Sequence, residues 1–451
     1  MNLVRNYQCL IFGLVWVTYC VTYCLRKPLG IVKPKLELDL SLTKTQLGWL
    51  DLALLLPYSG VQILCSHVWD RIPPRHLIAL CLSMASLAMM MIGIGNSFYV
   101  ICVCLFISGA GQAPLWPACT KMLSSWFVDS RLSSVFGIIS TSQYAGSLLG
   151  TGLAIYIQEK AGWPWVYVPA GIAGLIMATF NLLFLLGPKD MLLEIPGKTY
   201  VSPTHLAKDK KRQSYAFLLS IPGVADVTMA VFCLKFVRYC MHMWLPLYLI
   251  DHLKYSQTAG GLFSTMFDVG GILGGPILGL LVDHCTKHQP LWGIFLMLML
   301  GTVCFTLIAF IASWGTIYCS VLLLMVGAAN CGPDSLLTGS VTMMIGEKYG
   351  SNTGAGVTSL VNGIGSIGAI VEGPIIGLIS QQVGWHGVMG LMIALSFFAM
   401  LATLRGFLVL KLHDRALARK KAEDELLTLQ TPLVDEQACE VLELESSQLT
   451  V

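Results

Sequence analysis

The sequence predicts an all-α integral membrane protein whose twelve transmembrane helices form two pseudo-symmetric six-helix bundles. The first observation is composition: 55% of the 451 residues are hydrophobic and 12% are charged, whereas a soluble domain carries about 25% charged residues. The second is that apolar stretches long enough to cross a bilayer recur along the chain, with short polar breaks between them. The third is that the second half of the chain repeats features of the first.

Each predicted span follows from the roughly 20 apolar residues that a helix needs to cross the hydrocarbon core. No small-residue cleavage site follows the first span, so we expect it to be retained and not removed as a signal peptide. The spans cover residues 8–32, 46–68, 76–94, 98–124, 133–157, 165–187, 219–250, 258–282, 291–312, 316–345, 354–380 and 387–410.

A polar, basic segment at 188–218 separates the two halves. We therefore expect an N-terminal six-helix bundle at 1–187, a cytosolic linker at 188–218 and a C-terminal six-helix bundle at 219–411. The tail 412–451 begins basic and turns acidic, and we expect it to be disordered or to form a short cytosolic helix.

The distribution of Lys and Arg predicts the orientation in the membrane. Most of them fall in the termini, the linker and the other loops on the same side, which the positive-inside rule places in the cytosol. Both termini are therefore predicted to be cytosolic. The loops assigned to the opposite side hold Lys33, Lys35, Lys44, Lys160 and Lys254.

An internal repeat relates the two halves. Residues 256–263 (SQTAGGLF) align without gaps with residues 43–50 (TKTQLGWL), and the same alignment superimposes the turn that contains Asp283 on the turn that contains Asp70 and Arg71. We expect these loop residues to cap or pair with a neighbouring helix end and so to influence conformational change. The alignment also places Arg238 opposite position 25, next to Arg26.

Arg26 and Arg238 each lie deep inside an apolar span. A guanidinium in the hydrocarbon region costs roughly 2.5–3.5 kcal/mol, so both should face the protein interior or a water-filled cavity. Arg meets phosphate oxygens two at a time and keeps its charge. We therefore predict that this pair binds an anion. Two further sets share a helix face with these arginines, namely Tyr19 and Tyr23 with Arg26, and Lys235 and His242 with Arg238.

Four acids inside the spans leave an alternative open. They could balance Arg26, Lys27, Lys235 and Arg238 one for one in structural salt bridges, without any bound anion. They could instead orient other side chains or take up a coupling ion. The four acids are Asp51, Asp268, Asp334 and Glu372.

Five segments carry recognisable motifs. They are YCVTYCLRK in the first span, FVRYCMHMWLP in the seventh, GAGQAPLWPACTKMLSSWF (109–127), LFSTMFDVGGILGG (262–275) and CGPDSLLTGSV (331–341). These segments resemble the organophosphate:phosphate antiporter family of the major facilitator superfamily, and within it the larger eukaryotic branch of sugar-phosphate exchangers. The resemblance implies the superfamily fold and assigns phosphoryl contact to Arg26 and Arg238. The chain departs from many members at Gln62, where they have Lys, and from bacterial members at Gln143, where they have His.

The expected function is exchange of a phosphorylated small metabolite, such as a sugar phosphate or a glycerol-3-phosphate-like ester, for inorganic phosphate by alternating access. Two alternatives are a proton- or sodium-coupled symporter of another organic anion, and a non-transporting membrane sensor or scaffold. No nucleophile–base pair or metal-ligand spacing stands out, so we expect no enzyme activity, metal or cofactor. We expect lipid but no nucleic acid as a partner, and a functional monomer. The family resemblance favours the endoplasmic reticulum membrane, with an endolysosomal or plasma membrane as alternatives.

Overall fold

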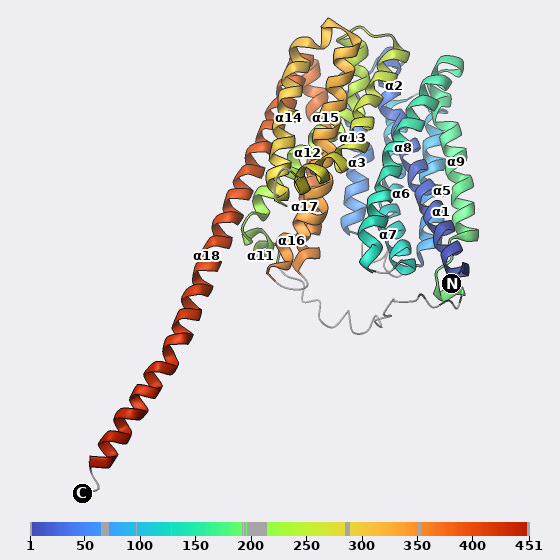
Figure 1. Ribbon diagram of the computed structural model, residues 1–451. Helices are drawn as coiled ribbons and strands as arrows, with labels where there is room; N and C mark the ends of the chain where they lie inside the picture. Colours follow the sequence, from blue (N-terminus) through green and yellow to red (C-terminus); the bar gives the residue numbers. More distant parts are fainter. Residues whose placement is uncertain are drawn as a thin grey trace.

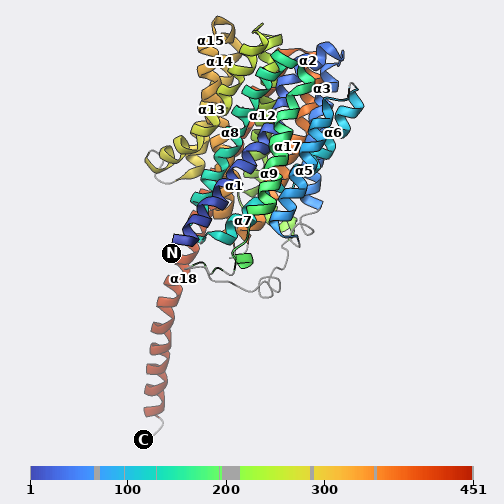
Figure 2. The same cartoon turned by 90° about the vertical axis from the view of Figure 1, so that its right-hand side faces the viewer.

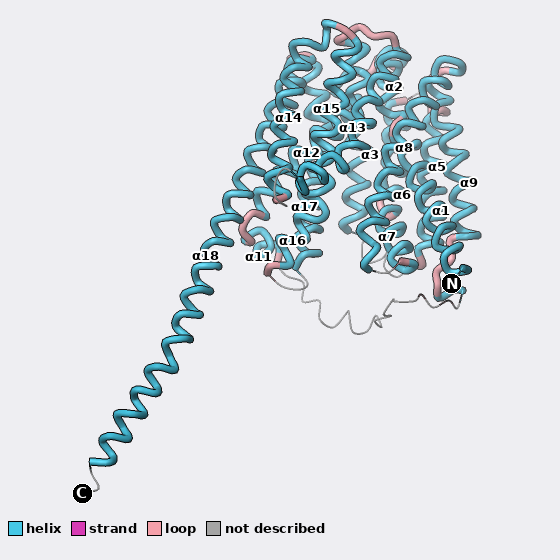
Figure 3. Tube along the Cα trace, viewed as in Figure 1, coloured by secondary structure: helices cyan, strands magenta, loops and turns pink. Residues whose placement is uncertain are grey.

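The computed structural model describes residues 2–64, 72–95, 97–127, 129–191, 193, 195, 214–284, 289–349 and 353–448. Within these ranges all regular secondary structure is helical (Figure 3). Nine of the described helices, counting kinked ones as single spans, are long and apolar enough to cross a membrane. The helices α3, α8 and α12 run alongside these nine and complete twelve spans (Figure 1). The predicted fold class is confirmed.

The helices of the N-terminal half form the right-hand group in Figure 1. They are α1 (Asn2–Arg26), α2 (Pro28–Asp39), α3 (Lys44–Leu64), α5 (Pro74–Ile92), α6 (Phe98–Gln112), α7 (Leu115–Trp126), α8 (Asp129–Ala161) and α9 (Tyr167–Phe184), with short 3-10 turns at Trp163–Val166 and Lys189–Met191.

The C-terminal half repeats this arrangement on the left. Its elements are α11 (Tyr215–Ser220), α12 (Val224–Asp251), α13 (Gln257–His284), α14 (Pro290–Ile311), a 3-10 turn at Ala312–Trp314, α15 (Thr316–Leu336), a π-helical turn at Leu337–Val341, α16 (Thr342–Glu347), α17 (Thr353–Gln382) and α18 (Trp385–Gln448). Most of the predicted linker lies outside the described residues.

The first span is broken into α1 and α2 at Lys27. Pro28 begins α2, and since proline has no backbone N–H it interrupts the helical hydrogen-bond ladder. The Lys27 amide still bonds the Tyr23 carbonyl at 2.9 Å, so the two helices continue in nearly one line. The break places Arg26 and Lys27 together at mid-span.

The two halves join most closely at the end of the bundle that is remote from the N-terminus, which we call the distal end. Here α3 packs on α17, α8 on α13 and α2 on α12. Lys44 pairs with Asp251 and the Thr45 hydroxyl donates to the Gln381 side chain at 2.6 Å, so polar bonds tie the halves together.

A backbone-to-backbone contact underlies this joint. A Cβ added to Gly48 of α3 would lie 2.2 Å from the Gly373 carbonyl oxygen of α17, so no side chain fits there. Glycine at both positions lets the helices touch.

Both ends of the chain lie on the side opposite the distal end (Figure 1). The helix α18 starts at the distal end, crosses the bundle and continues well beyond it to Gln448 (Figure 2). We expected the tail to be disordered or to form a short helix, but as far as Gln448 it is helical and continues the last span. Its Ala, Leu, Glu, Lys and Arg residues are strong helix formers, which accounts for this difference.

Candidate anion-binding site

A small cavity lies at the centre of the molecule between the two halves. Its volume is about 20 Å³, which is room for about one water molecule. A ligand larger than a water molecule therefore fits this site only when the halves move apart. The lining side chains are Tyr23 and Arg26 of α1, Gln143, Tyr144 and Ser147 of α8, Arg238, Tyr239 and His242 of α12, and Phe267 and Asp268 of α13.

Arg26 ends α1 and is 2% exposed. Its Nε and Nη2 atoms donate to Oε1 of Gln112 at 3.1 and 3.0 Å. The guanidinium also lies 4.4 Å from the ring centre of Tyr58, a cation–π contact. Its Nη1 atom has no hydrogen-bond partner among the described residues. A buried cation is thus held by neutral groups, with one donor free to receive an anion.

Arg238 faces the same cavity from the other half but has a different set of partners. Its Nη1 atom donates to Oδ2 of Asp334 at 2.8 Å, and its Nη2 atom donates to Oε1 of Gln143 at 2.9 Å. The Tyr23 hydroxyl donates to the same oxygen of Gln143 at 3.1 Å. Gln143 of α8 therefore links Tyr23 of α1 to Arg238 of α12 across the boundary between the halves.

A buried salt bridge adjoins the two arginines. The Lys27 Nζ atom lies 3.0 Å from Oδ2 of Asp268, and the Ser147 hydroxyl donates to that oxygen at 2.7 Å. The His242 Nδ1 atom lies 3.5 Å from the Lys27 Nζ atom. Lys27 belongs to the N-terminal half and Asp268 to the C-terminal half, so this pair also stabilises the closed arrangement.

One-for-one pairing of the four acids with the four predicted cations is wrong. Asp268 and Asp334 do pair with Lys27 and Arg238. Asp51 instead contacts Lys33 at 2.6 Å, and both carboxylate oxygens of Glu372 lack a hydrogen-bond partner in the described part of the chain.

Lys33 had been expected in a loop, but α2 continues past it and buries it completely. Its ammonium lies 3.7 Å from the ring centre of Trp244. The helix extends beyond the apolar stretch that marked the span, because Asp51 and the indole ring compensate the buried charge. Lys33 comes seven residues after Arg26, the spacing of a shared helix face, and that spacing was the signal in the sequence.

Three of the residues predicted to bind substrate do not line the cavity, namely Lys27, whose salt bridge is described above, Tyr19 and Lys235. The Tyr19 ring packs 4.7 Å from that of Trp116. Lys235 Nζ donates to Oδ1 of Asn362 at 2.7 Å and to the Ser366 hydroxyl at 3.2 Å, both on α17.

For four other predicted residues, the structure describes no side-chain position. Asp70 and Arg71 lie outside the described residues, and so do the side chains of Gln62 and Asp283, whose backbones belong to α3 and α13.

Sequence reasoning missed several neutral residues that complete the site. Their positions are Tyr58, Gln112, Tyr144, Ser147 and Tyr239. The match of 109–127 to a family motif contained Gln112, which was the available signal for that residue.

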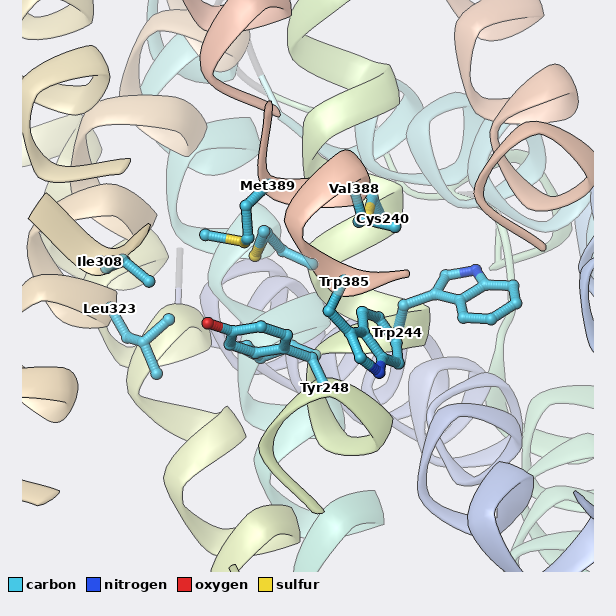
Figure 4. A pocket seen from close by; sticks show the side chains of 10 residues that line it. Cys240, Trp244, Tyr248, Ile308, Leu323, Trp385, Val388 and Met389 are labelled. Atoms are coloured by element: carbon cyan, nitrogen blue, oxygen red, sulfur yellow. The ribbon is translucent and has the colours of Figure 1, made fainter. Parts of the chain in front are cut away.

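A second cavity, of about 10 Å³, lies within the C-terminal half (Figure 4). Trp244, Tyr248 and Trp385 lie close together along it, and the Trp385 indole donates to Asp251 at 2.7 Å. Its walls are hydrophobic apart from the Tyr248 hydroxyl, so it offers a phosphoryl group no charged partner. It contributes to packing beside the distal joint.

Comparison with known proteins agrees with this architecture. Residues 15–358 match the Major Facilitator Superfamily. The chain belongs to this superfamily of membrane transporters.

Particular relatives narrow the class. The glucose-6-phosphate exchanger SLC37A2 of Bos taurus is 26% identical, over 88% of this chain and 94% of the relative. Putative glycerol-3-phosphate transporter 1 of Arabidopsis thaliana is also 26% identical, over 84% of this chain and 76% of the relative. Both names agree with the resemblance to organophosphate antiporters that the motifs indicated.

Among solved structures, a bacterial homolog of the human lysosomal transporter Spinster, in an inward-facing and unoccupied conformation, superimposes with a TM-score of 0.71. It is 16% identical, and the match covers 89% of this chain and 97% of that one. This likeness supports the fold.

Proposed function

We propose that the protein exchanges a phosphorylated small metabolite, a sugar phosphate or a glycerol-3-phosphate-like ester, for inorganic phosphate by alternating access. The observation that carries this proposal is Arg26, which is a buried cation with neutral partners that shares a cavity with Arg238. The relatives named for glucose-6-phosphate exchange and glycerol-3-phosphate transport support phosphate esters as the substrate class.

The chemistry of the two guanidinium groups favours a doubly charged phosphoryl group. Each guanidinium presents parallel N–H donors that match two phosphate oxygens, and the two come from opposite halves. A phosphoryl group between them neutralises the charge of Arg26 and competes with Asp334 for Arg238. The other partner of Arg238, Gln143, is neutral and therefore adds no negative charge that would repel the anion.

The same arrangement couples reorientation to cargo. Without an anion, Arg26 has no carboxylate partner among the residues described, and its desolvated charge opposes closure of the halves around it. A bound dianion removes that cost on either side of the membrane. The carrier therefore reorients loaded, with ester in one direction and phosphate in the other, and needs no ion gradient.

The placement in the cell follows the charge distribution and the family resemblance. The protein is a multi-pass membrane protein. Both termini face the cytosol, because the basic loops lie on their side. The distal end then faces the lumen of the endoplasmic reticulum. The protein acts as a monomer in contact with lipid.

Transport in proteoliposomes tests the proposal. Vesicles preloaded with unlabelled phosphate should take up labelled phosphate, and a panel of phosphate esters added outside should compete with the label. Vesicles without internal phosphate should take up almost none. Equal uptake by loaded and unloaded vesicles would contradict exchange, and accumulation that follows an imposed proton or sodium gradient would favour the symporter.

A further inference from the structure

Glu372 of α17 is a buried carboxyl group that forms no hydrogen bond with any described residue. Its side chain is fully buried, and both carboxylate oxygens lack a hydrogen-bond partner in the part of the chain that the structure describes. It is not at the central cavity and touches neither arginine there. The proposed exchange does not use it.

The groups that face Glu372 come from three helices. Asp51 of α3 and Lys33 of α2 are the charges that act on it, and the Cys240 thiol of α12 adjoins it. Lys33 is already engaged, with Asp51 at 2.6 Å on one side and the Trp244 ring on the other. Among the described residues, the cluster therefore contains two carboxyl groups but only one ammonium group, which already pairs with Asp51.

Titratable groups elsewhere along the helices that pack on α17 have other partners or lie far from Glu372; Glu347 of α16, for example, is exposed at the opposite end. On α12, Lys235 bonds to Asn362 and Ser366, and the Asp251 carboxylate at the distal end pairs with Lys44 of α3. On α18, the His386 ring packs against His252. None of these contacts reaches the Glu372 oxygens.

Electrostatics then decide the protonation state of Glu372. An ionised carboxylate without donors in a dry interior costs several kcal/mol, and the Asp51 carboxylate adds repulsion. The neutral acid avoids both penalties. We propose that Glu372 is a proton-binding site that is occupied whenever the halves are closed at the distal end.

The position of Glu372 connects this proton to the conformational cycle. The next residue, Gly373, makes the backbone contact with Gly48 that joins α17 to α3. Separation of the halves here parts the acid from Asp51 and Lys33 and admits water from the distal side. Glu372 then ionises and releases its proton to that side.

The proton therefore binds and leaves on the same side of the membrane. One proton is taken up on closure at the distal end and one is returned on opening, with no net transfer. Acid on the distal side favours the closed arrangement, and rising pH favours opening. Compartment pH thus regulates the carrier without driving it.

The test measures the conformation directly and needs no substrate. Two exposed residues at the distal end can carry labels on opposite halves. Leu38 lies near the end of α2 and is 72% exposed, and Val383 follows α17 and is 66% exposed. Spin labels attach there through a non-canonical keto amino acid, since the chain contains 15 cysteines. The distance distribution is recorded in lipid nanodiscs from pH 5 to pH 8.

The expected result is a short distance at acidic pH and a growing second population at longer distance as pH rises. Glu372→Gln, which mimics the neutral acid, should keep the short distance at every pH. Asp51→Asn frees Lys33 to stabilise an ionised Glu372 while the halves are closed, so closure no longer needs a proton and the short distance should persist to a pH about one unit or more higher than in the wild type. Glu347→Gln, an exposed acid at the opposite end, should behave like the wild type.

Two results would overturn the proposal. One is a wild-type distribution that does not change with pH, and the other is a Glu372→Gln protein that keeps the wild-type dependence. If Glu372→Gln does not fold, an Asp51→Asn protein that keeps the wild-type dependence on pH has the same force. Because no transport is measured, these outcomes are separate from any failure of phosphate exchange.

Discussion

Arg26 and Arg238 line one cavity from opposite halves, and their partners differ in charge. The neutral Gln112 amide holds Arg26, whereas the Asp334 carboxylate holds Arg238. The two cations thus have unequal tasks in the proposed cycle. Arg26 has no anionic partner among the described residues until the substrate binds, whereas Arg238 exchanges the Asp334 carboxylate for the phosphoryl group.

Replacing Arg26 by Lys should lower phosphate exchange about 100-fold, because an ammonium keeps the charge but loses the planar pair of donors. Labelled phosphate uptake into phosphate-loaded vesicles measures the loss. Arg405→Ala provides the control, since this arginine is 78% exposed on α18, and its rate should stay within about twofold of wild type. Full activity of Arg26→Lys would show that the charge alone suffices.

Replacing Asp334 by Asn should tighten phosphate binding by about tenfold and slow exchange. The amide removes the anion that competes for Arg238, so phosphate binds more firmly and leaves more slowly. Equilibrium binding by calorimetry and exchange rates give the two quantities. Weaker binding in Asp334→Asn would mean that the carboxylate positions Arg238 for the ligand and does not compete with it.

Ester binding should weaken at acidic pH, because the two guanidinium groups remain charged while the ligand gains a proton. A phosphate ester takes up its second proton near pH 6. Below that pH the dissociation constant should rise by up to about tenfold per unit, and above it should level off. Measurements in Glu372→Gln exclude the other titration that we propose. Sulfate stays doubly charged over this range, and its binding should not change.

Replacing Gly48 by Val should prevent full closure at the distal end. Its side chain would overlap the Gly373 carbonyl oxygen, which lies 2.2 Å from the Cβ position. Exchange should fall more than tenfold, and the distance between labels at positions 38 and 383 should lengthen. Gly60→Ala on the same helix meets nothing within 4 Å and should leave both readouts unchanged.

Breaking the salt bridge between Lys27 and Asp268 should destabilise the protein more than removing it altogether. Lys27→Met leaves a buried carboxylate without its cation, at a cost of about 3–5 kcal/mol. The double variant Lys27→Met with Asp268→Asn should recover part of the loss in melting temperature. Equal melting temperatures for the single and double variants would contradict a paired buried charge.

The fold could be predicted from sequence because apolar spans and their repeat are local signals. The same depth argument singled out Arg26 and Arg238, since charge inside an apolar stretch is visible without coordinates. Gln112 and Tyr58 could not be assigned this way, because a neutral residue in a span gains meaning only when a neighbouring helix brings it to the guanidinium.

Which acid pairs with which base was harder to predict from the sequence than the neutral partners of Arg26. Hydropathy ended the first span before Lys33, although the helix continues and buries it against Asp51. Which acid meets which base depends on the contacts between α2, α3, α12 and α17 across the two halves. Such contacts are tertiary, and no spacing within one span encodes them.

The break between α1 and α2 has a mechanical consequence. α1 packs within its own half, on α8 and α9, whereas α2 also lies against α12 of the other half. The first span therefore contacts both halves, and Lys27 lies between its two segments. Arg26 is the last residue of α1, so a change in the angle between α1 and α2 changes the position of its guanidinium relative to α12. Bending of the first span would therefore alter the distance between Arg26 and Arg238.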